Sequence, residues 1–455
     1  RRSEDRRCAA GLRRAVRSSR AWPSLRRVGD LVRRTLECVL DQHPQVLQLV
    51  AELRSPAAES DAITCLPREV VAEARYKLGE AIGWGTPEWE RHGFWPSEEQ
   101  RQRSPIHGAL LARLAYLAGD PDPEPARWVI GAGLWAFNSP EAPGTGAPLG
   151  FNPARPITRS GVFPRTASAA EGQKLGARAL ADWAAVSAGG DPNYKSVSDP
   201  ELAPRVRKQL GEEVTKRFVQ VFATLAALTA VVANWGRAVP SKLAAIPKKA
   251  SEKLRIIQDL RRSGVNERCV VPERLVLPRL HDAAADGVAL MRAAASQRSP
   301  AQASWNVWRS PSASSSVQLA EEVGVEGAVI DIADAFKLID VAPEERRFLA
   351  AEVLGKFYLW AVCVFGAASA PLVWGRMAAL LIRLTQGMFD GLEGRANMYI
   401  DDILMQMCGA PAERTRQLAC VLLLLAVLGF PVALHKVAFG PDLEWIGARF
   451  TWGPD

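Results

Sequence analysis

Two adjacent aspartates, Asp401 and Asp402, stand inside the apolar segment NMYIDDILM. Two like charges beside a hydrophobic run are costly to bury unless a cation compensates them, and burial raises their pKa values. Apolar residues on both sides of the acids predict two short strands joined by a tight turn that carries both carboxylates. Such a hairpin would present oxygen ligands to a hard cation such as Mg²⁺. The alternative is a solvated turn, since Asp is a favoured turn residue.

A third carboxylate, Asp331, follows the apolar run 328–330 in the segment GAVIDIADAF. This run predicts a buried strand that delivers Asp331, and a turn or helix could begin at Asp334 and Phe336. If the two strands meet, Asp331 joins the pair of acids at the hairpin. Three carboxylates from two elements can hold two divalent ions, one to activate a 3′-hydroxyl and one to stabilise the leaving pyrophosphate.

The sequence around these acids resembles the fingers and palm of a reverse transcriptase, most closely those of long-terminal-repeat retroelements and retroviruses. The resemblance covers roughly residues 238 to 450 and implies an α+β right-hand polymerase core, in which helices pack on an antiparallel sheet. It also implies an RNA-directed DNA polymerase of a retrotransposon-like element, a nucleotidyltransferase that uses Mg²⁺ or Mn²⁺. Five blocks in the family's order carry the resemblance: KKASEKLRIIQDLRRSGVN, AVIDIADAF, PEERRFLAAEVLGKFYLWAVCVFGAASAPLVWGRM, MYIDDIL and LGFPVALHKVAFGPDLEWIGARF.

The resemblance implies that Asp331, Asp401 and Asp402 are the metal ligands. The alternative for Asp402 is that this second acid of the turn points away from the metal. Lys436 in ALHKVAF lies near the point where the family has a lysine that can protonate the leaving pyrophosphate. The alternative for Lys436 is a strand lysine that faces solvent, and His435 beside it is a weaker candidate.

Further residues would contact the incoming nucleotide. Lys248 or Lys249 and Arg255, on the fingers hairpin, would bind its triphosphate unless they are ordinary solvated charges. Phe336 would lie against the sugar and exclude a 2′-hydroxyl, or else be a core side chain. Gly366 would let the backbone approach the nucleotide or the template, because glycine has no Cβ.

Other positions in the same blocks have supporting roles. Tyr399, directly before the acidic pair, is also assigned to the nucleotide site. Pro371 would set the first turn of the helix that follows it. Gln258, with Asp259 and Arg261, fits the role of fixing the fingers strand better than that of contacting substrate.

The basic excess of the chain is concentrated near its first residue. The formal net charge is +8, and residues 1–35 hold twelve Arg against three acids, so the remainder nets about −1. A basic tail could contact nucleic acid, could be a solvated arm, or could be the remnant of a targeting segment. We favour the solvated arm.

The seven cysteines predict neither a zinc site nor a disulfide framework. They are widely scattered, with no Cys-x-x-Cys pair and no His at finger spacing, which fits a reducing compartment, the cytoplasm or the nucleus. Two apolar stretches, 218–235 and 419–430, are shorter than the ~20 residues that a membrane span needs. We therefore expect two buried helices and no membrane partner.

A chain of 455 residues is long enough for two or three domains. Composition and patterning divide it into a basic tail, a helical region of unknown role, a Pro/Gly-rich linker, a helical segment, and the fingers and palm. In that order, these segments are 1–36, 37–137, 138–167, 168–237 and 238–455.

The expected partners are a primer on an RNA or DNA template and deoxynucleoside triphosphates. No protease signature, nucleic-acid knuckle or ribonuclease H cluster is visible, and the sequence stops just past the palm, without a thumb. The first alternative is therefore an inactive or domesticated fragment that binds nucleic acid. The second is a template-directed RNA polymerase with the same palm, which Phe336 disfavours.

Overall fold

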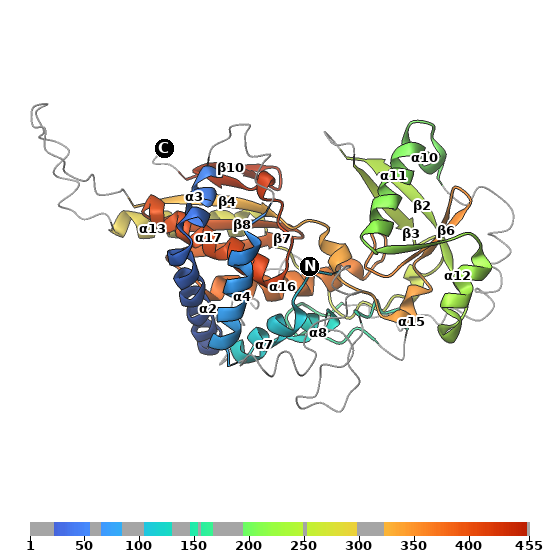
Figure 1. The fold of residues 1–455 in the computed structure, drawn as a ribbon, viewed down its shortest axis with the longest axis horizontal. Helices are drawn as coiled ribbons and strands as arrows, with labels where there is room; N and C mark the ends of the chain where they lie inside the picture. The colour runs from blue at the N-terminus through green and yellow to red at the C-terminus, as the bar shows by residue number, and fades with distance from the viewer. Residues whose placement is uncertain are drawn as a thin grey trace, which may run out of the picture.

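The structure is a computed structural model, and two lobes stand side by side in it (Figure 1). One lobe is built on a four-stranded sheet and the other on a five-stranded sheet, with helices on both, which confirms the predicted α+β class. The residues described are 22–54, 65–83, 104–129, 146–152, 156–166, 194–248, 253–297 and 323–452.

The four-stranded sheet is antiparallel throughout, in the order β7-β8-β4-β9. Its side chains alternate between two cores because successive residues of a strand point to opposite faces. On β8, Ile403 and Met405 lie in the large core, whereas Leu404 lies in a smaller one. The strands are β4 (Gly324–Asp331), β7 (Gly394–Tyr399), β8 (Asp402–Gly409) and β9 (Ala438–Gly440).

Helices cover the large-core face of this sheet, and a helix and a hairpin cover the other face. Pro371 lies in the first turn of α16, as predicted, where its missing N–H costs no helical hydrogen bond. The large-core face carries α16 (Ala370–Gly387) and α17 (Pro411–Leu428). The opposite face carries α13 (Leu280–Gln297) and the hairpin of β10 (Asp442–Trp445) and β11 (Ala448–Thr451).

The apolar stretch 419–430 agrees with its prediction as a buried helix. It forms most of α17, whose side chains from Leu418 to Leu425 are all buried. No helix in the described parts of the chain is long and apolar enough to cross a bilayer.

The second lobe contains the five-stranded sheet, in the order β1-β6-β5-β2-β3. Strands β2 and β3 form the predicted fingers hairpin, and β2 also runs parallel to β5. The strands are β1 (Val219–Phe222), β2 (Pro240–Pro247), β3 (Leu254–Asp259), β5 (Ala350–Val353) and β6 (Lys356–Trp360). Three helices accompany them, α10 (Lys195–Ser198), α11 (Leu202–Thr215) and α12 (Leu225–Val231).

The prediction of one buried helix over 218–235 is wrong. The segment begins as strand β1, which pairs with β6, and continues as the short helix α12 and a 3₁₀ turn at Ala233–Trp235. Val231 and Trp235 are about half exposed. The helical and strand patterns cannot be separated in so apolar a run, and pairing with a distant strand decides between them.

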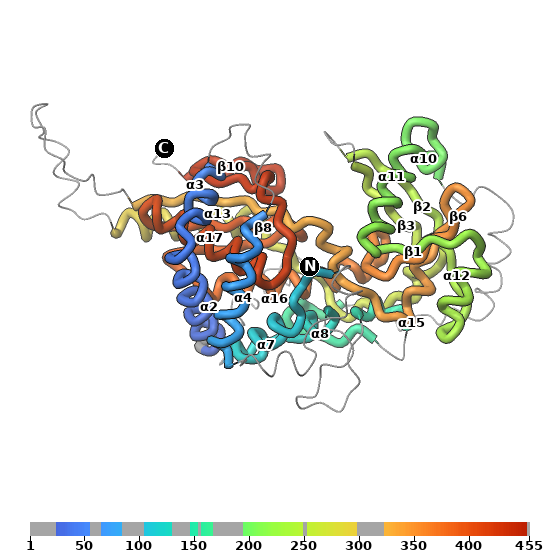
Figure 2. The backbone as a smooth tube through the Cα atoms, in the orientation of Figure 1, coloured from blue at the N-terminus to red at the C-terminus, as the bar shows by residue number. Residues whose placement is uncertain are grey.

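The N-terminal helices pack against the back of α16 and α17. Figure 2 shows the blue N-terminal tube alongside the red and orange C-terminal helices. Gly29 allows the closest crossing, because a Cβ there would lie 1.9 Å from the Gly387 carbonyl oxygen. These helices are α2 (Trp22–Gln42), α3 (Pro44–Glu52), α4 (Arg68–Ala81), α7 (Gly108–Ala118) and α8 (Glu124–Trp128).

The expectation of a solvated basic arm does not hold from residue 22 onward. Helix α2 crosses the expected boundary at residue 36, and its apolar side chains Leu25, Val32 and Leu36 are buried. Arg27 and Arg34 are exposed, whereas Arg33 is partly buried, bonds Glu393 at 2.8 Å and lies over the ring of Phe389. The first 21 residues lie outside the described part of the chain.

The described residues between 138 and 167 have no helix, as expected of a loop, but they are held against the rest of the protein. The Phe151 N–H donates to the buried carboxylate of Glu345 at 2.8 Å, and the Gly161 N–H donates to Glu273 at 2.8 Å. Glu345 belongs to the short helix α15 (Pro343–Arg346). This part of the predicted linker therefore packs as a structural segment.

Candidate functional site

The predicted acidic hairpin is present. Strands β7 and β8 are joined at Ile400 and Asp401, and Tyr399 pairs with Asp402 across the turn. One detail differs from the prediction, since Asp402 is the first residue of β8 and only Asp401 lies in the turn proper. We call residues 400–402 the acidic turn. Ile400 has φ +58°, a left-handed conformation that is rare for a β-branched residue.

The pairing of β4 with β8 brings the third carboxylate to the acidic turn. In the antiparallel register Asp331 lies directly opposite Asp402, so their Cα atoms are about 4.5–5.5 Å apart and their side chains leave the same face of the sheet. The Ile332 N–H donates to the Asp401 carbonyl at 3.1 Å. The predicted meeting of Asp331 with the hairpin acids is therefore confirmed.

The site holds more negative charge than its surroundings compensate. Burial raises the pKa of Asp401, and the charge of Asp331 raises it further. Burial and the charges of both neighbours raise the pKa of Asp402 to about 6. Lys436, in the 3₁₀ turn Leu434–Lys436, donates to Asp331 Oδ2 at 3.0 Å and is about half exposed. Lys436 is therefore a cation of the site and not a remote strand lysine.

The chemistry of this donor set fits a hard divalent cation, but the side chains do not form a finished metal site. Carboxylate oxygens suit Mg²⁺ or Mn²⁺, and the raised pKa values mark charge that a cation would offset. Within the described residues, however, no three His, Cys, Asp or Glu side chains are arranged to hold a metal ion. The Asp331 carboxylate accepts a hydrogen bond from the Lys436 ammonium group at 3.0 Å.

Two exposed cations of the fingers hairpin act on the acidic turn. The positive charges of Lys248 and Arg255 lower the pKa of Asp401, although burial outweighs them. Lys248 follows β2, and Arg255 lies on β3 opposite Ile246. Lys249 lies outside the described residues.

Phe336 and Gly366 both have partners within the protein. Phe336, in the 3₁₀ turn Ala335–Leu338, is 8% exposed, with its ring centroid 5.1 Å from that of Phe365. Gly366 has φ +115°, and a Cβ there would lie 1.9 Å from the Gln258 carbonyl oxygen. Glycine is therefore needed at position 366 because the backbone there passes close to strand β3. Gln258 is 2% exposed, and its N–H donates to the Phe365 carbonyl at 2.9 Å, in agreement with a role in fixing the fingers strand.

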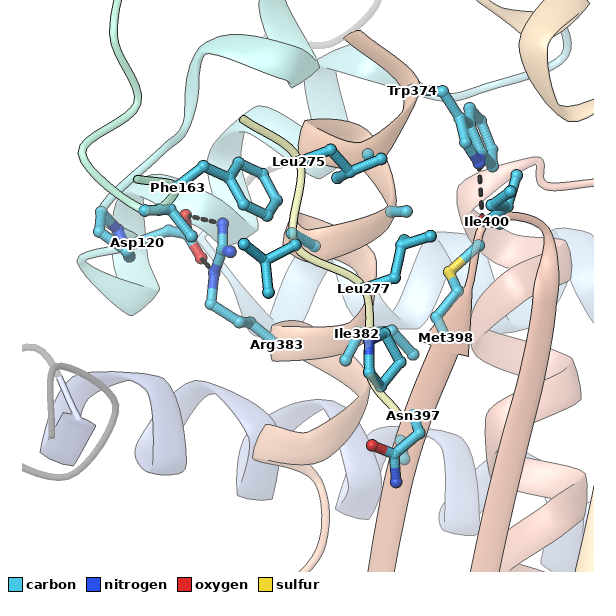
Figure 3. A pocket seen from close by; sticks show the side chains of 18 of the residues that line it. Asp120, Phe163, Leu275, Leu277, Trp374, Ile382, Arg383, Asn397, Met398 and Ile400 are labelled. Carbon is cyan, nitrogen blue, oxygen red and sulfur yellow. Dashed lines mark hydrogen bonds and ion pairs between the residues drawn. The ribbon is translucent and has the colours of Figure 1, made fainter. Parts of the chain in front are cut away.

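Two tryptophans touch the acidic turn, and sequence reasoning assigned them no role. The Trp374 indole N–H donates to the Ile400 carbonyl at 2.8 Å (Figure 3). The Trp445 indole N–H donates to the Asp402 carbonyl at 3.3 Å. Both residues stand inside the family-like blocks, which was the only signal that could have drawn attention to them.

A cavity of about 410 Å³ lies behind the turn, between α16, the end of β7 and the loop before α13. Its lining is mostly apolar, and its charged members Asp120 and Arg383 pair with each other at 2.7 and 2.8 Å. Figure 3 shows Trp374 and Ile400 together at one end of it. Ile400, the residue directly before Asp401, is therefore part of the cavity wall.

Residues 246–450 match the family model described as reverse transcriptase (RNA-dependent DNA polymerase). The sequence matches no curated protein. Similar solved structures include a foamy viral protease-reverse transcriptase in complex with double-stranded DNA (15% identity, TM-score 0.36, 55% of this chain and 40% of that chain). Another is the same kind of protein in complex with an RNA/DNA hybrid (15% identity, TM-score 0.37, 56% of this chain and 26% of that chain).

A third similar structure is the native prototype foamy virus protease-reverse transcriptase (16% identity, TM-score 0.37, 56% of this chain and 27% of that chain). The matched parts thus span less than half the length of these viral proteins. The family match includes the acidic turn, Asp331, Lys436 and the two fingers cations. Residues 246–450 therefore belong to the reverse transcriptase (RNA-dependent DNA polymerase) family.

Proposed function

We propose that this protein is an RNA-directed DNA polymerase that extends a primer by two-metal nucleotidyl transfer. The observation that carries the proposal is the β4–β8 register, which sets Asp331 opposite Asp402 beside the turn that bears Asp401. The family of residues 246–450 supplies the reaction class. We also propose that the chain derives from a retrotransposon-like element.

Asp331 and Asp401 would hold the divalent ions, and Asp402 would be the third ligand. When bound, Mg²⁺ or Mn²⁺ would favour deprotonation of the primer 3′-hydroxyl and offset the charge of the phosphates. The ligands must be deprotonated to bind metal, so the raised pKa of Asp402 makes metal binding pH-dependent.

The cations around the acids would handle the triphosphate. Arg255 and Lys248 are exposed on the fingers hairpin and act electrostatically on Asp401. A triphosphate between this hairpin and the acidic turn would therefore have these two side chains on one side and the metal ions held by the aspartates on the other. Lys436 would donate a proton to the pyrophosphate oxygen as it leaves, since its ammonium group already lies within 3.0 Å of Asp331.

Selection of deoxynucleotides would depend on Phe336. Its ring is packed against Phe365, which is 37% exposed, so the pair forms an aromatic surface at the edge of the site. A ring held in that way would leave no room for a 2′-hydroxyl. Gly366, directly after Phe365, joins this surface to strand β3.

Primer extension on an RNA template with Mg²⁺ tests the proposal. Asp401→Asn should abolish extension, because it removes a ligand charge without changing side-chain volume. Asp390→Asn is the matched control, since Asp390 is exposed in the loop between α16 and β7 and an Asn oxygen can accept the same bond from the Leu392 N–H. Equal extension by wild type and Asp401→Asn would place the site elsewhere.

A second candidate is a nucleic-acid-binding protein without catalysis. The observation that favours it is the lack of a preformed metal site among the described residues. The same experiment separates the two, because the binding protein would retain primer and template tightly and never extend the primer with Mg²⁺ or Mn²⁺.

A further inference from the structure

The acidic turn is held by three successive carbonyl groups. The carbonyl of Ile400 accepts from the Trp374 indole, that of Asp401 from the Ile332 backbone, and that of Asp402 from the Trp445 indole. The three donors belong to different elements, namely α16, the residue after β4, and β10. The backbone that carries the acids is therefore bonded from three directions.

The turn would not be expected to keep this conformation by itself. Ile400 has φ +58°, in the left-handed region, which is strained for a β-branched residue. Asp401 and Asp402 are adjacent like charges in a partly buried place, which adds repulsion. Contacts from outside the hairpin must offset both the backbone strain at Ile400 and the repulsion between the two aspartates.

We propose that Trp374 and Trp445 are positioning residues, whose indole N–H groups clamp the acidic turn so that Asp401 and Asp402 face the reacting atoms. This inference rests on the proposed polymerase function. Both indoles are about 1% exposed, so each N–H is desolvated and its bond to a carbonyl is directional. Neither residue touches substrate in this assignment; each acts through the turn.

The two indoles also tie the turn to separate parts of the protein. Trp374 lies on α16, whose far face contacts the N-terminal helices, and it closes one end of the cavity in Figure 3. Trp445 lies on the β10–β11 hairpin, which packs with α13 on the opposite face of the sheet. The position of the carboxylates thus depends on both layers that flank the sheet.

A buried tryptophan also stabilises a protein by packing, so the test must separate the N–H from the ring. The variants are Trp374→Phe and Trp445→Phe, which keep an aromatic ring and remove the donor. The chain offers two matched controls. The Trp360 indole N–H donates to Glu213 at 2.9 Å, and the Trp452 indole N–H donates to Gln406 at 3.0 Å, both away from the turn.

The first measurement is single-turnover nucleotide addition as a function of Mg²⁺ concentration, with primer-template affinity measured in parallel. One hydrogen bond contributes about 0.5–1.5 kcal/mol, so loss of either clamp should slow addition by about twofold to tenfold. It should also raise the Mg²⁺ concentration needed for half-maximal rate, while primer-template affinity stays within twofold. Trp360→Phe and Trp452→Phe should leave the rate and the Mg²⁺ requirement unchanged, even where they lower the melting temperature.

The second measurement does not depend on activity. Hydrogen exchange of the segment 399–403, followed by mass spectrometry, should become faster in Trp374→Phe and Trp445→Phe and stay unchanged in the two controls. Equal effects of all four substitutions on rate and exchange, or no effect of the clamp substitutions on either, would overturn the inference. An inactive wild-type protein whose exchange pattern is as expected would refute the polymerase function and leave the clamp standing.

Discussion

Asp402→Asn should make the metal-free protein more stable and abolish activity, if the Asp402 carboxylate is a metal ligand whose charge destabilises the fold. Burial and the neighbouring acids raise the pKa of Asp402 from 3.8 to about 6 in the folded protein. A difference of about 2 pH units corresponds to about 3 kcal/mol of unfavourable free energy for the charged form. Solvent screening of this partly accessible carboxylate reduces the expected gain to about 1–2 kcal/mol.

The pH dependence of this gain has a fixed sign. The folded state holds its proton more tightly than the unfolded state, so the penalty is absent below the unfolded pKa near 3.8 and complete above about 6. The Asn variant should therefore gain most at pH 7.5 and about half as much at pH 5. The assay is thermal unfolding in a buffer with a chelator, where a gain of this size corresponds to a shift on the order of 1–2 °C for a chain of 455 residues.

Two comparisons make the measurement decisive. Asp442→Asn should give no gain, because a hydrogen bond from Arg449 lowers the pKa of Asp442 and the charged form is already favoured. Excess Mg²⁺ should stabilise the wild type and have less effect on Asp402→Asn, since a ligand that binds only the folded state stabilises it. A destabilised Asn variant, or a gain that does not change with pH, would show that the charge of Asp402 is not the source of the penalty.

Three other predictions concern individual residues. Phe336→Ala should allow incorporation of ribonucleotides, measured as the ratio of ribonucleotide to deoxynucleotide addition, and should cost about 3–5 kcal/mol of stability; an unchanged ratio would leave Phe336 a core residue. Lys436→Met should slow nucleotide addition by about 100-fold and remove the fall of rate at high pH, whereas an unchanged pH profile would exclude Lys436 as the proton donor. Gly366→Ala should lower the melting temperature much more than Gly355→Ala, because both have positive φ but only the former would place a Cβ against backbone, 1.9 Å from the Gln258 oxygen; equal losses would show that strain in φ alone matters.

The parts of the site that sequence reasoning predicted are those set by local patterns. The acidic hairpin follows from apolar residues on both sides of two acids, and the strand before Asp331 follows from a short apolar run. Their meeting required the two strands to pair in one register, which is fixed because successive side chains of β8 pack into two different cores. The start of α16 at Pro371 was readable for the same reason, since a proline in the first turn is a local signal.

The parts that it missed depend on partners far away in the chain. Strand β1 is stabilised by its pairing with β6, about 140 residues later in the chain. Its own apolar sequence does not distinguish a strand from a buried helix. The roles of Trp374 and Trp445 depend on where an indole N–H points, which no spacing encodes. Gly366 was identified as a place of close approach, but only the structure gives strand β3 as the partner.

The N-terminal helices also depend on distant partners, and they belong structurally with the sheet that carries the acids, although sequence reasoning placed them in a separate region. Arg54, after α3, bonds Glu326 on β4 at 2.9 Å, and Arg414 on α17 bonds the same carboxylate at 2.7 Å. Two cations on one buried acid form a shared ion cluster, and removal of one partner leaves buried charge unpaired. Glu326 lies on the strand that ends at Asp331, so the region with no motif of its own is bonded to the strand that carries a catalytic candidate. The helices before residue 83 are therefore part of the support of the site, and a fragment cut at residue 238 would expose the faces of α16 and α17 that they cover.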